Sequence, residues 1–211
     1  MIISYHHKFI FIKTRKTAGT SIDVALAKYC SENDIVTQTL PEIEGHQPRN
    51  WQNLGIIGEH DPASKILHKV NWREFFTFAF ERNPWDKCVS MYWWRVNNKN
   101  SPVKEMSFKE FILKSQGRNS YAYFALPSDF DRYTDNHGNV IVDFLGRYEN
   151  LTNDLNYICK KINLPWNGKL SNEKANTRKD KRHYREYYDN ETREIIQHDF
   201  VKEIELFGYE F

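Results

Sequence analysis

Near the N-terminus the chain reads Phe9-Ile10-Phe11-Ile12-Lys13-Thr14-Arg15-Lys16-Thr17-Ala18-Gly19-Thr20-Ser21. The first four residues are β-branched or aromatic, which is typical of a buried strand. Apolar side chains then recur at helical spacing, at Ile22, Ala25, Leu26 and Tyr29. We therefore expect a strand, a loop and a helix N-terminus. Because the first N–H groups of a helix lack partners within it, the loop is predicted to bind an anion such as a phosphate or a sulfate.

The order of residues in this loop differs from that of a Walker A motif. That motif has a glycine, four further residues and then Gly-Lys-Ser/Thr. Here Lys16 comes before Gly19, and no lysine stands directly before Thr20 or Ser21. The order therefore does not support a Mg²⁺-binding role for Ser21. From this stretch alone, a basic turn that binds nothing remains an alternative.

A second apolar run, at residues 75–80, also predicts a strand. Asn83 suits a helix N-cap and Pro84 suits the first helical position. Arg82 is then expected at the carboxyl end of a strand, where open parallel sheets line their ligand crevice. Ser90, about two turns into the helix, is expected to face the same crevice. Two anion sites fit a nucleotide with phosphate at both ends better than a simple triphosphate.

The two stretches resemble the cofactor motifs of the PAPS-dependent sulfotransferases, and most closely the carbohydrate branch that includes the heparan and chondroitin enzymes. The matching residues are Lys16-Thr17-Ala18-Gly19-Thr20-Ser21 and Phe80-Glu81-Arg82-Asn83-Pro84-Trp85-Asp86-Lys87-Cys88-Val89-Ser90-Met91-Tyr92. Residues 144–151, 184–188 and 207–209 also resemble the family, so the likeness spans nearly the whole chain. Glu81 is a departure, because the family usually has an aliphatic residue there.

The resemblance implies a P-loop-like sulfotransferase fold. We expect a single α/β domain over residues 1–211, with a central, mostly parallel sheet flanked by helices. It implies the sulfuryl donor PAPS (3′-phosphoadenosine-5′-phosphosulfate) and the product PAP. We expect no metal, because the sequence offers no Asp/His cluster as a site and the cationic loop can stabilise the charge. The acceptor that it implies is a saccharide or glycan hydroxyl, and an amino-alcohol, a lipid or a tyrosine acceptor remains an alternative.

The resemblance also assigns roles to residues. The 5′-phosphosulfate is expected at Lys16, Thr17, Ala18, Gly19, Thr20 and Ser21, and the 3′-phosphate at Arg82 and Ser90. Arg178 and Lys179, in the basic run 169–185, become candidate lid contacts to the nucleotide. From the residues alone, a solvated loop explains this run equally well. Lys16 would stabilise the leaving group.

His60 becomes the catalytic base, because a histidine ahead of the second motif has that role in the carbohydrate branch. From sequence alone, an isolated histidine just before a helix cap is more often an ordinary surface residue. If His60 is not the base, His46 and Glu59 are the next candidates. Residues 35–58 are rich in Pro and Gly, and we assign them to the acceptor side. His46, Arg49 and Trp51 are then either substrate contacts or ordinary surface residues.

Further helices are expected after three polar caps. Asp61 is predicted to cap a helix from Pro62, Ser107 with Glu110 forms a capping box, and Asp189 or Asn190 caps a last helix that includes Phe200 and Ile204. A helix with Leu151 and Ile162 on its buried side is also expected. Residues 140–145 predict another buried strand, after a turn at residues 136–139.

Composition limits the function classes. The chain has 30 Lys and Arg against 28 Asp and Glu, so its net charge of +2 does not indicate a general nucleic-acid binder. Three widely spaced cysteines, Cys30, Cys88 and Cys159, favour reduced thiols and a cytoplasmic location. No stretch approaches the ~20 apolar residues of a membrane span.

Two alternatives to a sulfotransferase remain. One is a P-loop kinase or NTPase, and the other is a non-catalytic nucleotide- or glycan-binding module.

Overall fold

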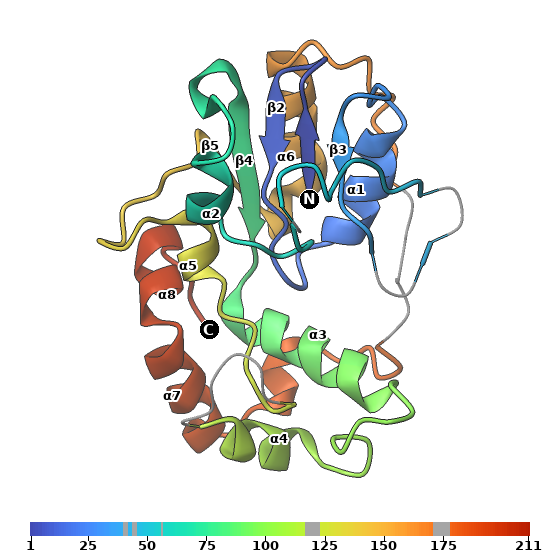
Figure 1. Cartoon of the computed structure of the whole chain (residues 1–211). Helices are drawn as coiled ribbons and strands as arrows, with labels where there is room; N and C mark the ends of the chain where they lie inside the picture. The colour runs from blue at the N-terminus through green and yellow to red at the C-terminus, as the bar shows by residue number, and fades with distance from the viewer. Residues whose placement is uncertain (40–41, 44–45, 56, 117–122, 171–177) are drawn as a thin grey trace. The chain divides into compact units, whose positions relative to one another are not determined.

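The chain folds into interleaved strands and helices (Figure 1). The computed structural model describes residues 1–39, 42–43, 46–55, 57–116, 123–170 and 178–211. Its strands are β1 Ile2–Ser4, β2 Phe9–Phe11, β3 Ile35–Val36, β4 Phe76–Glu81 and β5 Phe144–Arg147. Its α-helices are α1 Gly19–Ala27, α2 Ala63–Leu67, α3 Pro84–Val96, α4 Phe108–Ser115, α5 Phe130–Tyr133, α6 Leu151–Lys161, α7 Asn190–Asp199 and α8 Val201–Phe207. Short 3-10 helices are η1 Trp72–Glu74, η2 Tyr148–Asn150 and η3 Tyr184–Tyr187.

The five strands form one sheet in the order β3-β1-β2-β4-β5. Strands β2, β4 and β5 are parallel neighbours, whereas β1 is antiparallel to both β2 and β3. The predicted α/β fold with a central sheet is therefore confirmed, and both predicted motif strands, β2 and β4, lie in its parallel part. The antiparallel strands were not predicted, because β1 has three residues and β3 two, too few to show a period.

Both faces of the sheet are buried, which explains why β2 and β4 read as continuous apolar runs. On one face Phe11 and Phe78 pack with Ile22 of α1 and Leu155 of α6. On the other face Ile10, Ile12 and Ala79 pack with residues of α2 and with Tyr133 of α5. Successive strand residues thus face opposite layers of helix.

The chain forms two compact units. The first, Met1–Glu81 with Asp129–Glu173, contains the sheet and helices α1, α2, α5 and α6. The second, Arg82–Ser128 with Lys174–Phe211, contains α3, α4, α7 and α8. The first motif and His60 therefore belong to one unit and the second motif to the other. That residues 1–211 act as a single domain stays a prediction.

The second unit is built around the aromatic face of α3. The side chain of Asn83 accepts hydrogen bonds from the N–H groups of Trp85 and Asp86, as its predicted capping role requires. Trp85 is buried, and the ring of Tyr92 lies 5.5 Å from that of Phe108 in α4. The predicted caps at Ser107 and Asp189 are also present, as capping boxes of α4 and α7.

The starts of β5 and α2 differ from their predicted positions, because in each case a carboxylate forms hydrogen bonds that the sequence did not predict. The strand expected at 140–145 begins only at Phe144, since the Asp143 carboxylate accepts hydrogen bonds from the Thr77 N–H and hydroxyl at 2.7 and 2.8 Å. The Asp61 carboxylate accepts from Gly58 N–H and Lys65 Nζ, so α2 begins at Ala63 without a side-chain cap.

The predicted last helix is interrupted. Phe200 is buried, and its backbone leaves the helical region with φ −116° and ψ 24°. The segment therefore forms two helices, α7 and α8, where one was expected.

Candidate functional site

The loop between β2 and α1 has an unusual backbone. Lys16 and Ala18 both adopt the left-handed conformation, with φ of 62° and 61°. This conformation costs a non-glycine residue about 1–3 kcal/mol and is concentrated at ligand sites. Turns of alternating hand direct successive N–H groups into one concavity, which binds anions. Ala18 is the N-cap of α1 and offers no side-chain acceptor to the first N–H groups of the helix. The loop therefore has the features of an anion site.

The hydroxyl groups of the loop stabilise its shape. Thr14 Oγ1 lies 2.8 Å from Thr17 Oγ1 and donates to the carbonyl oxygen of Phe80 in β4. Thr17 is fully buried. Its side chain therefore belongs to the support of the loop, so a contact of Thr17 with an anion would come through its N–H group. Thr20 is partly exposed and Ser21 is buried.

Gly19 is required by close packing. A Cβ atom at this position would lie 2.8 Å from Cγ of Lys13 and 3.3 Å from the carbonyl oxygen of Thr14. The Lys13 side chain passes directly beneath the first residue of α1. Any larger residue at position 19 would displace that side chain.

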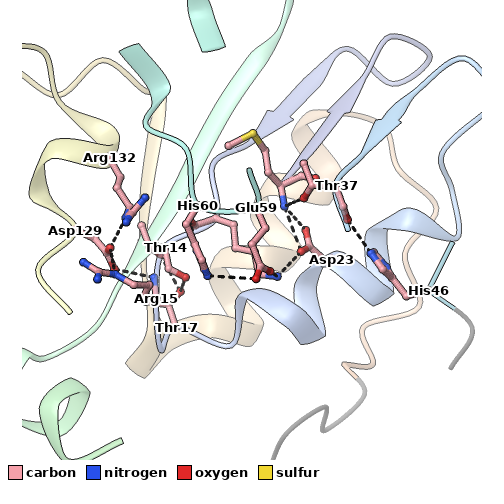
Figure 2. A network of polar contacts seen from close by, with 12 residues as sticks. Thr14, Arg15, Thr17, Asp23, Thr37, His46, Glu59, His60, Asp129 and Arg132 are labelled. Atoms are coloured by element: carbon pink, nitrogen blue, oxygen red, sulfur yellow. Dashed lines mark hydrogen bonds and ion pairs between the residues drawn. The ribbon is translucent and has the colours of Figure 1, made fainter. Parts of the chain in front are cut away.

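Lys13 is the centre of a buried charge network that the sequence did not reveal. Figure 2 shows its two partners, Asp23 and Glu59. Its side chain is 2% exposed, and Nζ lies 2.8 Å from Asp23 Oδ2 and 2.5 Å from Glu59 Oε2. Asp23, also fully buried, binds the α-amino group of Met1 at 3.0 Å. Burial alone would lower the pKa of Lys13, but the two carboxylates outweigh it and hold the pKa above its ordinary value. Burial alone would raise the pKa of Glu59, but Lys13 and His60 hold it below its ordinary value.

His60 is oriented by the backbone of the same lysine. Its Nδ1 lies 2.9 Å from the carbonyl oxygen of Lys13. Because a carbonyl only accepts, Nδ1 carries the hydrogen and Nε2 of the neutral ring is left as a proton acceptor. Nε2 lies 3.9 Å from Glu59 Oε1, and the side chain is 31% exposed. Burial lowers the pKa of His60, which Glu59 only partly offsets, so the ring is neutral at pH 7.

The basic side of the loop is held by Asp129, another residue that the sequence did not single out. The N–H and Nε of Arg15 donate to Asp129 at 2.7 and 2.8 Å, and Arg132 Nε donates to the same carboxylate. Asp129 is buried. Figure 2 shows this group on one side of Thr14 and Thr17, and Glu59 on the other.

In the second unit, two of the predicted arginines share one carboxylate. Arg82 donates from Nε and Nη2 to Asp86 Oδ2 at 3.0 and 2.6 Å, and Arg178 Nη1 lies 3.4 Å from Asp86 Oδ1. Ser90 is partly exposed and follows Asp86 by four residues, which places both on one face of α3. Arg82 and Arg178 therefore both pair with Asp86, which lies one helical turn before Ser90. Their binding of an anion stays a prediction.

Arg178 is further held by its own segment. Its Nε donates to the carbonyl oxygen of Asp180, and its guanidinium lies 5.0 Å from the ring centre of Tyr187. Lys179 is exposed. The preceding residues 171–177 of the predicted basic run lie outside the described residues.

The three predicted acceptor contacts are placed elsewhere in the first unit. His46 is nearly buried, and its Nε2 lies 3.1 Å from the carbonyl oxygen of Thr37. Arg49 donates to the carbonyl oxygen of Ala27, and Trp51 packs against the apolar cluster of α2. Figure 2 shows His46 beyond Thr37, on the side of Asp23 away from His60. These side chains have structural partners, and their contact with an acceptor stays a prediction.

The described residues contain neither a metal-ligand cluster nor a membrane-spanning helix. No group of three or more His, Cys, Asp or Glu side chains among them is arranged to hold a metal ion. None of the helices described has the length and apolar character needed to cross a bilayer.

Comparison with known proteins gives a family match along nearly the whole chain. Residues 1–210 match the sulfotransferase family, and this range includes both compact units. An uncharacterized protein of Archaeoglobus fulgidus is 42% identical over 110 residues, which cover 49% of this chain and 83% of that protein. No solved structure matches.

Proposed function

Because the chain belongs to the sulfotransferase family, whose reaction is the transfer of a sulfuryl group, we propose that it uses PAPS as donor and a saccharide hydroxyl as acceptor. The observation that carries the proposal is the bond from His60 Nδ1 to the carbonyl oxygen of Lys13. This bond leaves the proton-accepting nitrogen of His60 beside the loop that has the features of an anion site. A proton acceptor and an anion site are the two parts that direct sulfuryl transfer to a hydroxyl needs.

The donor is proposed to be bound through both of its charged ends. The 5′-phosphosulfate would be held by Lys16 and by the N–H groups of residues 17–21. The 3′-phosphate would be held by Arg82 and Ser90, with Arg178 and Lys179 as further contacts. The left-handed loop and the two guanidinium groups that share Asp86 support these assignments, since each is suited to an anion.

The residues of the chain then act in one displacement. PAPS supplies the activated sulfuryl group. His60 Nε2 takes the proton of the acceptor hydroxyl as its oxygen bonds to sulfur, and the bond from sulfur to the bridging oxygen breaks with its electron pair on that oxygen. Lys16 stabilises the charge that develops there. A base in this position contributes about 10²–10⁴-fold to the rate.

A kinase or NTPase is disfavoured by the second strand end. Such an enzyme needs an acid that binds Mg²⁺ there, and Arg82 follows β4 directly. Glu81 ends the strand, but it is fully buried and accepts a hydrogen bond from Tyr133 at 3.1 Å. We therefore prefer the sulfuryl-transfer proposal.

Thermal unfolding with added ligand tests the donor. A ligand at 100 times its Kd stabilises the folded state by about 2.7 kcal/mol. PAP is expected to raise Tm clearly, while ATP with Mg²⁺ is expected to raise it much less; the reverse order would favour the kinase alternative. Arg82→Gln should weaken PAP about 10-fold or more, whereas the exposed Arg73→Gln should leave its binding unchanged.

Turnover tests the base and the acceptor. His60→Ala should reduce turnover of PAPS with a saccharide acceptor by about 10²-fold or more and change PAP binding little. Full turnover in this variant would refute the role of His60. A panel of saccharide, lipid, amino-alcohol and tyrosine acceptors identifies the acceptor class, and activity with none of them would favour a binding module.

A cytoplasmic location is part of the proposal. The three cysteines are free thiols, which suits a reducing compartment.

A further inference from the structure

The two oxygens of the Glu59 carboxylate face different partners, Lys13 and His60. Oε2 binds the buried ammonium of Lys13 at 2.5 Å, and Oε1 lies 3.9 Å from Nε2 of His60. The first contact is a hydrogen bond between an ammonium and a carboxylate. The second is too long for a hydrogen bond but short enough for an ion pair once His60 is protonated.

Lys13 fixes both members of this arrangement. Its ammonium holds Glu59, and its carbonyl oxygen holds Nδ1 of His60 at 2.9 Å. Asp23 binds the same ammonium at 2.8 Å and is itself fully buried, so Lys13 has little freedom to move. Lys13, in the loop between β2 and α1, therefore sets the orientation of Glu59 relative to the imidazole.

We propose that Glu59 is a positioning residue for His60, holding a carboxylate beside Nε2 so that the imidazolium formed during the reaction is stabilised. The inference rests on the proposed function of His60 as base. When Nε2 takes the proton of the acceptor hydroxyl, the O–H electron pair forms the bond to sulfur, and the new positive charge on the ring faces Oε1 of Glu59. Neither Glu59 nor Lys13 exchanges a proton in this step.

The surroundings of His60 make this carboxylate important. The charged groups that act on the ring are Glu59, Asp129 from the segment before α5, and Lys13 from the loop after β2. Burial and the Lys13 ammonium disfavour the imidazolium. Glu59, the Lys13 carbonyl oxygen and Asp129 favour it, and of these Glu59 has the largest effect. Without Glu59 the ring would be a still weaker base.

The test measures His60 directly and independently of turnover. The imidazole is titrated by NMR in the whole protein, as wild type, Glu59→Gln and Glu59→Asp. Glu74→Gln is the matched control, because it removes an exposed carboxylate of the same unit that pairs with Lys8. We expect the pKa of His60 to fall by about one unit in Glu59→Gln, a tenfold change in proton affinity, to recover in part in Glu59→Asp, and to stay unchanged in Glu74→Gln.

The kinetic arm uses the same variants. With PAPS and an accepted hydroxyl substrate, Glu59→Gln should lower kcat several-fold, with little change in the KM for PAPS, and Glu59→Asp should restore part of it. An unchanged or raised pKa of His60 in Glu59→Gln would overturn the inference, whatever the activity. A lowered pKa together with full turnover of His60→Ala would instead refute His60 as base, and so separate the two failures.

Discussion

Replacing Lys13 with methionine tests whether the buried network supports the site. The change keeps the length of the side chain but removes the ammonium that Asp23 and Glu59 share. Removing one partner of a buried ion pair costs about 3–5 kcal/mol. Glu59 is 24% exposed and can reach water when Lys13 is removed, so we expect the lower value, about 3 kcal/mol. For a chain of this size that corresponds to a fall in Tm of about 6–12 °C.

Lys109 provides the matched control. It also shares its ammonium between two carboxylates, Asp189 at 2.6 Å and Glu191 at 2.8 Å, but all three side chains are about half exposed. Solvent screens such a pair, so Lys109→Met should change Tm little. Calorimetry or circular dichroism at pH 7 measures both variants. Equal shifts in Tm for Lys13→Met and Lys109→Met would refute the argument that burial gives the network its importance.

The pH gives a second check on the same variant. Lys13 keeps the pKa of Glu59 below its ordinary value of 4.5. The stabilisation from Glu59 is therefore present above pH 4.5 and is lost as the pH falls through the folded-state pKa. The difference in stability between the wild type and Lys13→Met should accordingly narrow below pH 4.5. A difference that stays constant there would indicate that lost packing, and not lost charge, destabilises the variant.

Three further predictions follow from single residues. Gly19→Ala should lower the free energy of unfolding by about 1–3 kcal/mol, measured by urea denaturation, because its Cβ would lie 2.8 Å from Lys13 Cγ. It should also weaken the binding of PAP, measured by calorimetry. A stability and an affinity equal to those of the wild type would contradict the close approach. The pKa of His60 lies below its ordinary value of 6.5, so the unfolded chain binds the proton first and stability should fall as the pH is lowered from 6.5. His60→Asn should reduce that slope in urea titrations, and an unchanged slope would exclude His60 as its source. Burial raises the pKa of Cys159 to about 12, so a thiol reagent at pH 8 should label it only after unfolding, and rapid labelling of the native protein would contradict its burial.

The parts of the site that the sequence predicted are local in the chain. The strand, loop and helix around Lys16 follow from the change of hydrophobic period within about 20 residues. The capping of α3 by Asn83 follows from residue types at adjacent positions and is present in the structure. Such features depend on neighbours along the chain, which is the information that a single sequence contains.

The parts that the sequence could not predict are pairings between distant residues. Lys13 and Glu59 are 46 residues apart, and Arg15 and Asp129 are 114 apart. Which acid meets which base depends on strand order and on the path of the loops, neither of which residue types specify. Asp143 illustrates the same limit, because its side chain binds Thr77, 66 residues away, and moves the start of β5 from the predicted position.

These pairings also give meaning to the near-balance of 30 basic and 28 acidic residues. The two basic stretches contain Lys13, Arg15 and Arg82, and each of these cations is paired with specific carboxylates. Lys13 binds Asp23 and Glu59, Arg15 binds Asp129, and Arg82 binds Asp86. The acidic residues reduce the positive electrostatic potential of these stretches, but they also fix the orientation of each cationic side chain. Because these long side chains are ordered before a ligand binds, less conformational entropy is lost on binding. Recognition would then depend on fixed donors, namely the N–H groups of the left-handed loop and the guanidinium groups around Asp86, more than on net charge. On the proposed function, fixed donors of this kind would let a chain with a net charge of only +2 bind a small, multiply charged anion.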